Sequence, residues 1–196
     1  MSKDTLLIFT RNPIYGKVKT RLAATIGHDK ALAVYQSLIE HTAAVTKSIE
    51  ATKIVYYSDF IINGDAWNNT YLKTVQQGAD LGERMSNAFS DALKYGAKKA
   101  IIIGTDCYDL NEAIITEAFE QLNSYDVVIG PALDGGYYLL GMKVHYHQLF
   151  ENITWSTETV LSETRARCNK LGLTYFLLPV LNDIDDEQDL ISTNLL

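Results

Sequence analysis

A basic segment near the N-terminus could bind a chain of phosphates. It spans residues 11–21, includes Gly16, and contains four of the 17 Lys and Arg residues of the protein, namely Arg11, Lys17, Lys19 and Arg21. Arginine can hold phosphate oxygens with a two-pronged fork, lysine adds a compact charge, and a helix opening at Thr20 would add free backbone N–H groups. The spacing differs from that of a Walker A loop. Charged runs are usually solvated turns, but the position of this one after a predicted strand favours phosphate binding.

Aspartates that follow other strand-like runs could bind a metal ion. Asp106 comes directly after the most apolar run of the chain, and Asp183 lies near the end of a late strand. Mg²⁺ and Mn²⁺ prefer oxygen ligands and are often held by one or two carboxylates together with phosphate oxygens. We interpret Asp106 as a ligand and Asp183 as a second candidate. A simpler explanation suits Asp109 and residues 186–189, which could cap or stabilise the helices that follow them.

A glycine-rich turn supplies one more carboxylate. The stretch Asp134-Gly-Gly-Tyr137 stands between two predicted strands, and its paired glycines permit either a tight turn or close approach of the backbone to a ligand. On its own the motif is weak evidence for a site. Together with Asp106 it gains weight, because Asp134 could act as a metal partner or as a general base.

Two smaller groups stand at predicted helix starts. Gly82 and Arg84 could meet a phosphate or a sugar there. Trp155 could stack on a ring, although a tryptophan in the core is the commoner outcome, and Ser156 or Thr157 could cap the next helix.

These residues must be positioned by strands that alternate with helices. The apolar, branched and aromatic runs that predict strands cover residues 6–10, 54–57, 100–104, 127–130, 137–142 and 174–178. Helical spacing appears in residues 31–45, 82–93 and 111–122. This alternation indicates an α/β sheet with helices on both faces. The short connection between residues 130 and 137 leaves no room for a crossover helix, so we expect one antiparallel pair in a mixed sheet.

The composition narrows the class of protein. A chain of 196 residues that is 47% apolar fits one domain, and its formal charge of -7 disfavours non-specific binding to nucleic acid or anionic lipid. The two cysteines form no CxxC pair, which suits a reducing cytoplasm, and no apolar run predicts a signal peptide or membrane span. The four histidines have no zinc-ligand spacing, and a GxSxG elbow is absent.

Six segments together resemble one family. They are PxxGKVKTRLA (13–23), GADLGERM (78–85), GTDCYDL (104–110), GPALDGGYYLLG (130–141), WST (155–157) and DIDDEQDL (183–190). In this order, over nearly the whole chain, they resemble the DUF2064 group, bacterial proteins provisionally labelled nucleotide-diphospho-sugar transferases with a GT-A fold. More distantly, the basic loop and the Asp-Gly-Gly turn are similar to 2-phospho-L-lactate guanylyltransferases and other small nucleotidyltransferases. Tyr108 departs from the family, which usually has proline there.

The resemblance implies a three-layer GT-A fold in one domain over residues 1–196, with a mixed, mostly parallel sheet. It also implies that Lys17, Lys19 and Arg21 bind phosphate, that Asp106 binds a metal, and that residues 134–136 meet the acceptor or sugar.

We therefore expect a transferase that uses a nucleotide donor with Mg²⁺ or Mn²⁺ and a small-molecule acceptor. A nucleotide-diphospho-sugar transferase is expected first, and the alternatives are a nucleotidyltransferase acting on a small phosphorylated or alcohol acceptor and a nucleotide-binding regulatory protein without catalysis. The predicted site comprises Asp106, Asp134 and Lys19 for catalysis, Arg11, Gly16, Lys17, Lys19, Arg21, Gly82 and Arg84 for the nucleotide, Asp134, Gly135, Gly136, Tyr137, Trp155 and Ser156 for the acceptor or sugar, and Asp106 and Asp183 for the metal.

Overall fold

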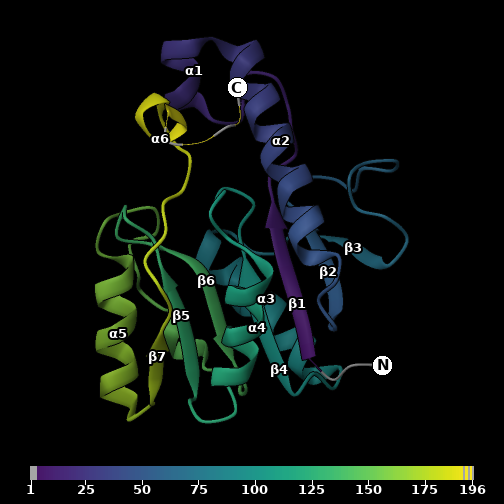
Figure 1. The fold of residues 1–196 in the computed structure, drawn as a ribbon. Helices are drawn as coiled ribbons and strands as arrows, with labels where there is room; N and C mark the ends of the chain where they lie inside the picture. Colours follow the sequence, from purple (N-terminus) through teal and green to yellow (C-terminus); the bar gives the residue numbers. More distant parts are fainter. Residues whose placement is uncertain (1–3, 192, 194, 196) are drawn as a thin grey trace.

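A mixed seven-stranded sheet forms the centre of the protein (Figure 1). The structure is a computed structural model, and it describes residues 4–191, 193 and 195. The strands are β1 (Asp4–Thr10), β2 (Thr52–Tyr57), β3 (Tyr71–Val75), β4 (Lys99–Ile103), β5 (Val127–Pro131), β6 (Tyr137–Met142) and β7 (Tyr175–Leu177). Their order in the sheet is β3-β2-β1-β4-β6-β5-β7. Only β6 runs against its neighbours among these strands, and the other adjacent pairs are parallel. The predicted mixed sheet and its antiparallel pair, β5 and β6, are confirmed.

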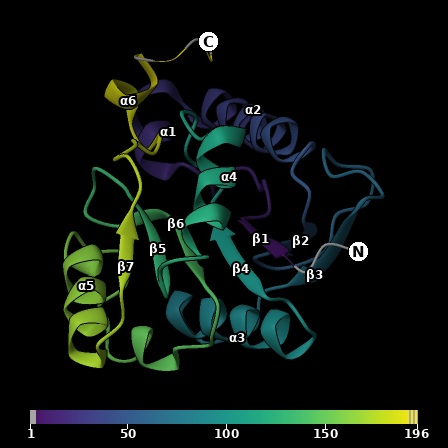
Figure 2. The same cartoon turned by 60° about the horizontal axis from the view of Figure 1, so that its bottom comes forward.

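Helices cover both faces of this sheet. They are α1 (Thr20–Ile26), α2 (His28–Thr46), α3 (Leu81–Lys94), α4 (Glu112–Gln121), α5 (Val160–Leu171), α6 (Glu187–Ile191) and the short 3-10 helix η1 (His147–Leu149). Figure 2 shows α2 and α4 on one side of the sheet and α3 on the other. The three-layer α/β architecture predicted from the sequence is confirmed.

Alternating side chains of the strands form a core on each face. Leu6 and Ile8 of β1 pack with Tyr35 of α2 in one cluster, whereas Leu7 packs with Phe89 of α3 in the other. Because both faces are covered, β1 is buried along almost its whole length. This explains why the strand reads as a continuous apolar run instead of an alternating one.

One strand, β3, is not predicted by the sequence pattern. β3 lies at the edge of the sheet and pairs only with β2, and it contains the polar residues Lys73 and Thr74. An edge strand with partly exposed side chains does not need the apolar run that marks a central strand. The sequence analysis therefore does not predict it.

A third apolar cluster joins the two ends of the chain above the sheet. Leu22 of α1 and Leu38 of α2 pack there with Ile184 and with Leu190 of α6. Figure 1 shows α6 beside α1, at the end of the molecule toward which β1 points. No helix in residues 4–191 has both the length and the apolar composition needed to span a bilayer.

Candidate functional site

The candidate site lies where the parallel strands end and where a late segment of the chain crosses between them. Leu133, in the turn after β5, donates its N–H to the carbonyl oxygen of Leu181 at 3.0 Å. Ile184 then donates to the carbonyl oxygen of Asp106, after β4, at 3.0 Å. Asp183 therefore lies between the ends of β5 and β4.

Four aspartates come together at this edge, namely Asp106, Asp134, Asp183 and Asp185, which we call the carboxylate cluster. Their proximity appears in the pKa of Asp183, which is raised to about 7 by burial and then by the charges of Asp106, Asp134 and Asp185, with Lys19 acting in the opposite direction. Carboxylates that share a site disfavour each other's ionisation. The cluster therefore has more negative charge than the nearby lysine neutralises, and this favours the binding of a cation.

Lys19 is the buried cation of the site. Its side chain is only 6% exposed, and its Nζ lies 2.6 Å from Asp106 Oδ1 and 3.1 Å from Asp185 Oδ1. Burial disfavours the charge, but the two aspartates outweigh it and raise the pKa of Lys19. Its backbone is left-handed, with φ 46° and ψ 47°, at the residue before α1. Such a conformation is costly for a residue with a Cβ and is often found at functional sites.

The other predicted phosphate ligands lie on the outside of the same loop. Arg21 is 77% exposed in its side chain and places Nη2 3.2 Å from Asp185 Oδ2. Arg11 and Lys17 are exposed, and Gly16 adopts a left-handed φ of 72° that lets the loop turn back. The loop therefore offers three exposed cations, one of which, Arg21, pairs with Asp185, and one buried cation, Lys19, which pairs with two carboxylates.

Two buried polar residues hold this loop in place. The Tyr35 hydroxyl accepts a hydrogen bond from the Arg11 N–H at 2.8 Å and lies 3.3 Å from Thr105 Oγ1, which joins the ends of β1 and β4. Asn12 is 2% exposed, and its amide donates to the carbonyl oxygen of Phe60 at 2.8 Å. Asn12 thereby fastens the loop to the segment after β2.

The Asp134 turn is tightly built. Gly136 N–H donates to Asp134 Oδ1 at 2.8 Å, so the carboxylate stabilises its own turn while facing the cluster. Gly135 has φ 87°, and a Cβ there would lie 2.2 Å from the carbonyl oxygen of Glu158. Tyr137 turns into the core: within the described chain its hydroxyl is buried without a hydrogen-bond partner, and burial, then Cys168, raises its pKa.

Gly82 and Trp155 contact each other. A Cβ on Gly82 would lie 2.2 Å from the indole Nε1 of Trp155, whose ring stacks on Phe150 with centroids 6.4 Å apart. Arg84 donates from Nε to the carbonyl oxygen of Gly78 at 3.1 Å. These residues are thus engaged in packing the start of α3, and their assignment to ligand binding stays a prediction.

Two predicted helix caps are wrong. Asn111, and not Asp109, caps α4, because its side chain accepts the Ile114 N–H at 3.2 Å. α5 begins at Val160 after Thr159, so neither Thr157 nor Ser156, which has a left-handed φ of 63°, is its cap. The prediction for residues 186–189 is confirmed, since the Asp186 carboxylate accepts the Gln188 and Asp189 N–H groups at 2.9 and 3.1 Å.

The carboxylate cluster fits a divalent cation that also binds a phosphate. In the part of the chain that the structure describes, no three His, Cys, Asp or Glu side chains meet closely enough to hold an ion by themselves. Mg²⁺ usually needs only one or two carboxylates when substrate phosphates and water complete its shell. Asp106, 41% exposed, and Asp183 could supply these oxygens.

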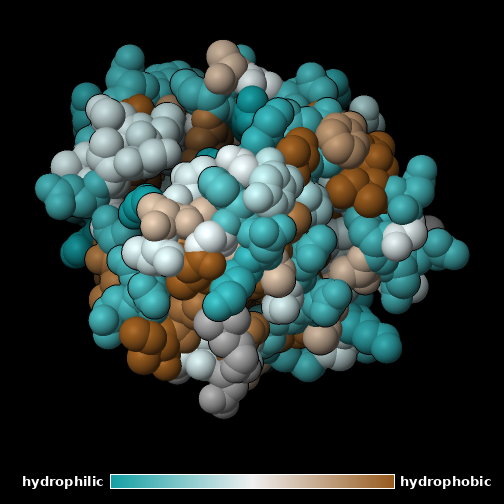
Figure 3. All heavy atoms as spheres, turned by 90° about the horizontal axis from the view of Figure 1, so that it is seen from above, coloured by the Kyte–Doolittle hydropathy of each residue, from teal (hydrophilic) through white to brown (hydrophobic). Residues whose placement is uncertain are grey.

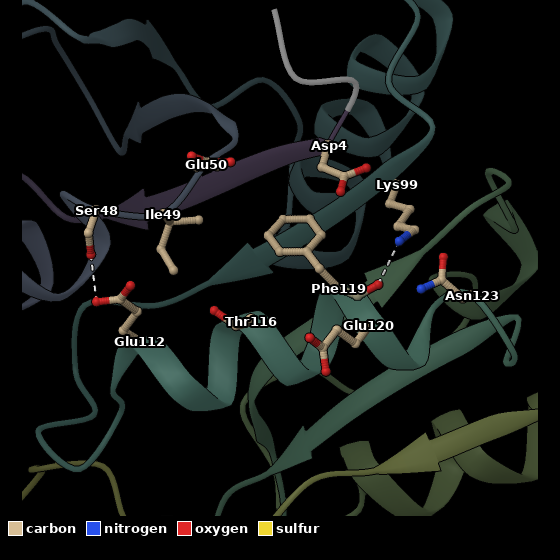
Figure 4. Close-up of a pocket in the computed structure, with 10 residues that line it drawn as sticks. All are labelled: Asp4, Ser48, Ile49, Glu50, Lys99, Glu112, Thr116, Phe119, Glu120 and Asn123. Carbon is tan, nitrogen blue, oxygen red and sulfur yellow. Dashed lines mark hydrogen bonds between the residues drawn. The ribbon is translucent and has the colours of Figure 1, made fainter.

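A pocket of about 320 Å³ lies at the opposite edge of the sheet and does not suit a nucleotide (Figure 4). Its lining includes the acidic residues Asp4, Glu50, Glu112 and Glu120, and its Lys99 donates to the carbonyl oxygen of Phe119 at 2.8 Å. Carboxylates repel phosphate. By contrast, the end of the molecule above the sheet is largely hydrophilic, with separate apolar patches (Figure 3).

Sequence reasoning missed Asp185, Asn12 and Tyr35. Asp185 could have been noticed because it follows Asp183 by two residues after the same strand. Tyr35 has the helical spacing of a core residue, and Asn12 is a single amide inside a loop. Neither carries a sequence signal for its contacts.

Comparisons with known proteins agree with this fold. The profile of the family described as "Uncharacterized protein conserved in bacteria (DUF2064)" matches residues 38–157. A crystal structure from Desulfovibrio desulfuricans G20, provisionally named as a nucleotide-diphospho-sugar transferase, is 32% identical, with a TM-score of 0.91 over 97% of this chain and 85% of that one. No functionally curated protein matches.

More distant structures share the fold alone. CMP:2-keto-3-deoxy-manno-octonic acid synthetase complexed with CTP has a TM-score of 0.58 at 10% identity, over 97% of this chain and 96% of that one. 4-Diphosphocytidyl-2C-methyl-D-erythritol synthase has a TM-score of 0.60 at 14% identity, over 97% of both chains. The fold is thus of the GT-A and nucleotidyltransferase type. The profile match and the 32% identical relative show that this chain belongs to the DUF2064 family.

Proposed function

We propose that this protein is a transferase that uses an activated nucleotide as donor and a divalent cation, Mg²⁺ or Mn²⁺, as cofactor. The observation that carries the proposal is the meeting of the basic loop and the carboxylate cluster, through Lys19, at the edge where parallel strands end. Ligands of α/β sheets bind at this edge. A cation held by carboxylates beside a basic loop suits a polyphosphate better than any uncharged ligand.

Each residue has a proposed task. Arg11, Lys17 and Arg21 bind the phosphate oxygens, and Lys19 stabilises the negative charge of the departing group. Asp106 and Asp183 hold the cation, which would neutralise phosphate charge when bound. Fixed charges of this kind lower the barrier because they are oriented before the reaction begins.

The first version of the reaction is transfer of a sugar. It is supported by the name of the 32% identical relative. A hydroxyl of the acceptor would attack the sugar carbon, the bond from that carbon to the diphosphate oxygen would break, and the nucleoside diphosphate would leave. Asp134 would take the hydroxyl proton as general base. Residues 134–136, with Trp155 and Ser156, are the candidates for sugar and acceptor contacts.

The second version is transfer of a nucleotidyl group. It is supported by the fold shared with cytidylyl-transferring enzymes. It is also supported by the charged residues of the site, most of which are proposed to bind phosphate or a metal ion. An acceptor oxygen would attack the α-phosphorus of a nucleoside triphosphate, the bond to the bridging oxygen would break, and pyrophosphate would leave.

Binding and turnover assays separate these versions. Thermal shifts are measured with a panel of nucleoside triphosphates and nucleotide-sugars, each with Mn²⁺ or with EDTA, and pyrophosphate and nucleoside diphosphate release are then followed. Pyrophosphate release indicates nucleotidyl transfer and diphosphate release indicates sugar transfer. Metal-dependent binding without either product in an acceptor screen would instead indicate a nucleotide-binding protein without catalysis.

The matched variants are Asp106→Asn and Asp109→Asn, which remove one charge each from the same loop. We expect Asp106→Asn to reduce turnover on the order of 100-fold and to abolish the Mn²⁺-dependent thermal shift, because it removes a metal ligand. Asp109 is exposed and has no proposed role, so its variant should resemble the wild type. Unchanged metal dependence in Asp106→Asn would refute the shared mechanism.

A further inference from the structure

In the structure, Lys19 pairs with Asp106, one of the two carboxylates that the proposed function assigns to the metal ion. Its ammonium lies 2.6 Å from Asp106 Oδ1, with Asp185 Oδ1 as a second anchor at 3.1 Å. A divalent cation that bound the same carboxylate would lie close to this ammonium, and two cations so close together repel each other. The lysine and the metal therefore compete for the negative charge of one carboxylate.

We propose that Lys19 and the metal ion exchange at Asp106, so that the free protein keeps its site closed by its own lysine. When the metal binds, Lys19 leaves Asp106 and turns toward the phosphates of the donor. The proposal rests on the proposed function, since it needs a metal at Asp106 and a phosphate ligand beside it.

The difference in exposure between the partners supports exchange. Asp106 is 41% exposed, so an ion from solvent can reach it, whereas Lys19 is 6% exposed and cannot meet a phosphate where it stands. A lysine that always served the phosphates would not need to be covered.

Asp185 provides the second position that an exchange requires. It contacts Lys19 through Oδ1 and the exposed Arg21 through Oδ2, at 3.1 and 3.2 Å. Its backbone is fixed by Asp189, whose carboxylate accepts the Asp185 N–H at 2.9 Å. When Lys19 leaves Asp106, Asp185 keeps it beside Arg21 and close to the ligand. Asp185 is thus a positioning residue.

Exchange couples the two ligands. The metal must displace Lys19, and phosphate gives the displaced ammonium a new partner, so each ligand strengthens the binding of the other. Binding couplings of this kind are reciprocal. The site would then fill with metal and nucleotide together and remain closed to either one at low concentration.

The first test needs no variant. Lysines of the wild-type protein are labelled briefly with acetic anhydride, and labelling of Lys19 and Lys17 is compared by peptide mass spectrometry. Without metal, Lys19 should be protected relative to the exposed Lys17. Saturating Mn²⁺ should raise Lys19 labelling at least about fivefold, and inorganic pyrophosphate added with Mn²⁺ should protect it again. Protection of Lys19 that persists with Mn²⁺ bound would overturn the exchange.

The second test measures Mn²⁺ binding alone by calorimetry in Lys19→Met and Lys17→Met. Both variants lose one charge from the same loop, but of these two lysines it is Lys19 that forms an ion pair with Asp106. Lys19→Met should bind Mn²⁺ about tenfold more tightly than Lys17→Met, because no lysine has to be displaced. Equal or weaker binding would refute the exchange. If the wild-type protein binds no Mn²⁺, both the exchange and the proposed function are refuted. If it binds Mn²⁺ but the labelling of Lys19 stays constant, only the exchange is refuted.

Discussion

At the scale of single residues, the site combines groups that are unfavourable for the fold when no ligand is present. Asp183 is the clearest example, because burial and then neighbouring aspartates raise its pKa to about 7. Groups with strongly shifted pKa values cluster at functional sites. The shift of Asp183 therefore supports the proposal that the carboxylate cluster binds a cation.

Asp183 should make the metal-free protein less stable as the pH rises. An unfolded aspartate has a pKa of about 3.9, so between about pH 4 and pH 7 the folded state holds a proton that the unfolded state has lost. The extra stability due to this proton is present at low pH and falls as the pH rises through about 7. We expect the free energy of unfolding of Asp183→Asn, relative to wild type, to increase between pH 5 and pH 8, on the order of 1–3 kcal/mol.

The measurement is urea unfolding in EDTA at a series of pH values, with Asp109→Asn as a variant of equal charge at an exposed position. If wild type and Asp183→Asn show parallel pH profiles, the carboxylate cluster does not interact as described. In saturating Mn²⁺ the order of stability should reverse, because the asparagine binds the ion more weakly.

Asn12 should be important for stability although no sequence motif includes it. Its Oδ1 accepts the Asp59 N–H at 2.9 Å while its amide donates to the carbonyl oxygen of Phe60, and Asn12→Ala removes both hydrogen bonds together with a buried side chain. We expect a loss of about 2–3 kcal/mol in the free energy of unfolding, against less than about 1 kcal/mol for Asn68→Ala, whose side chain is exposed. Chemical denaturation measures both values, and equal losses would contradict the role given to Asn12.

At the scale of elements, central strands, the edge strand β7 and the amphipathic helices α2, α3 and α4 were predictable, whereas β3 and α5 were not. β6 begins and ends where the sequence predicts, because its residues are buried by helices on both faces. β3 was missed since an edge strand carries polar side chains. α5 was also not delimited from the sequence, because it buries little more than Val160, Thr164 and Cys168.

The turn between β5 and β6 depends on packing as well as on backbone conformation. Gly135 has a left-handed φ, and a Cβ added there would meet Glu158, whereas Gly96 has a left-handed φ of 99° and a Cβ added there would meet no atom of the described chain within 4 Å. Gly96→Ala should cost about 1 kcal/mol for the backbone alone. Gly135→Ala should cost at least about 3 kcal/mol, since residues 157–160 must also move.

Thermal unfolding of the two glycine variants measures how much the contact with Glu158 adds to the cost of a side chain at residue 135. A similar decrease in Tm for both would show that the contact with Glu158 yields easily. If the prediction holds, Gly135→Ala should also weaken the stabilisation by Mn²⁺ and pyrophosphate, because Asp134 belongs to the same turn, and Gly96→Ala should not.

At the scale of the whole molecule, the location of the site was predictable and its assembly was not. Strand ends predicted which loops would meet, and the structure brings Lys19, Asp106, Asp134 and Asp183 to one edge. The engagement of Lys19 by Asp185 could not be predicted, because it depends on α6 packing on α1 and α2. Contacts between residues so far apart in the chain leave no trace in local periodicity.

Hydrogen exchange should reveal this assembly. On addition of Mn²⁺ and pyrophosphate, we expect slower exchange in residues 11–27 and 178–190, because the ligands would join the basic loop to the late segment. Residues 46–50 and 119–123, around the acidic pocket of Figure 4, should not change. Protection confined to the acidic pocket would place the ligand at the wrong edge of the sheet.

The ion pair between Lys19 and Asp185 joins residues that are 166 positions apart. Because a ribosome makes the chain from its N-terminal side, the basic loop is synthesised well before Asp185. The sheet can therefore begin to fold during synthesis, but the site is completed only when the segment after β7 has emerged and α6 has docked. A chain interrupted before this segment would contain the seven strands but would lack Asp185, which holds Lys19 from the C-terminal side of the site.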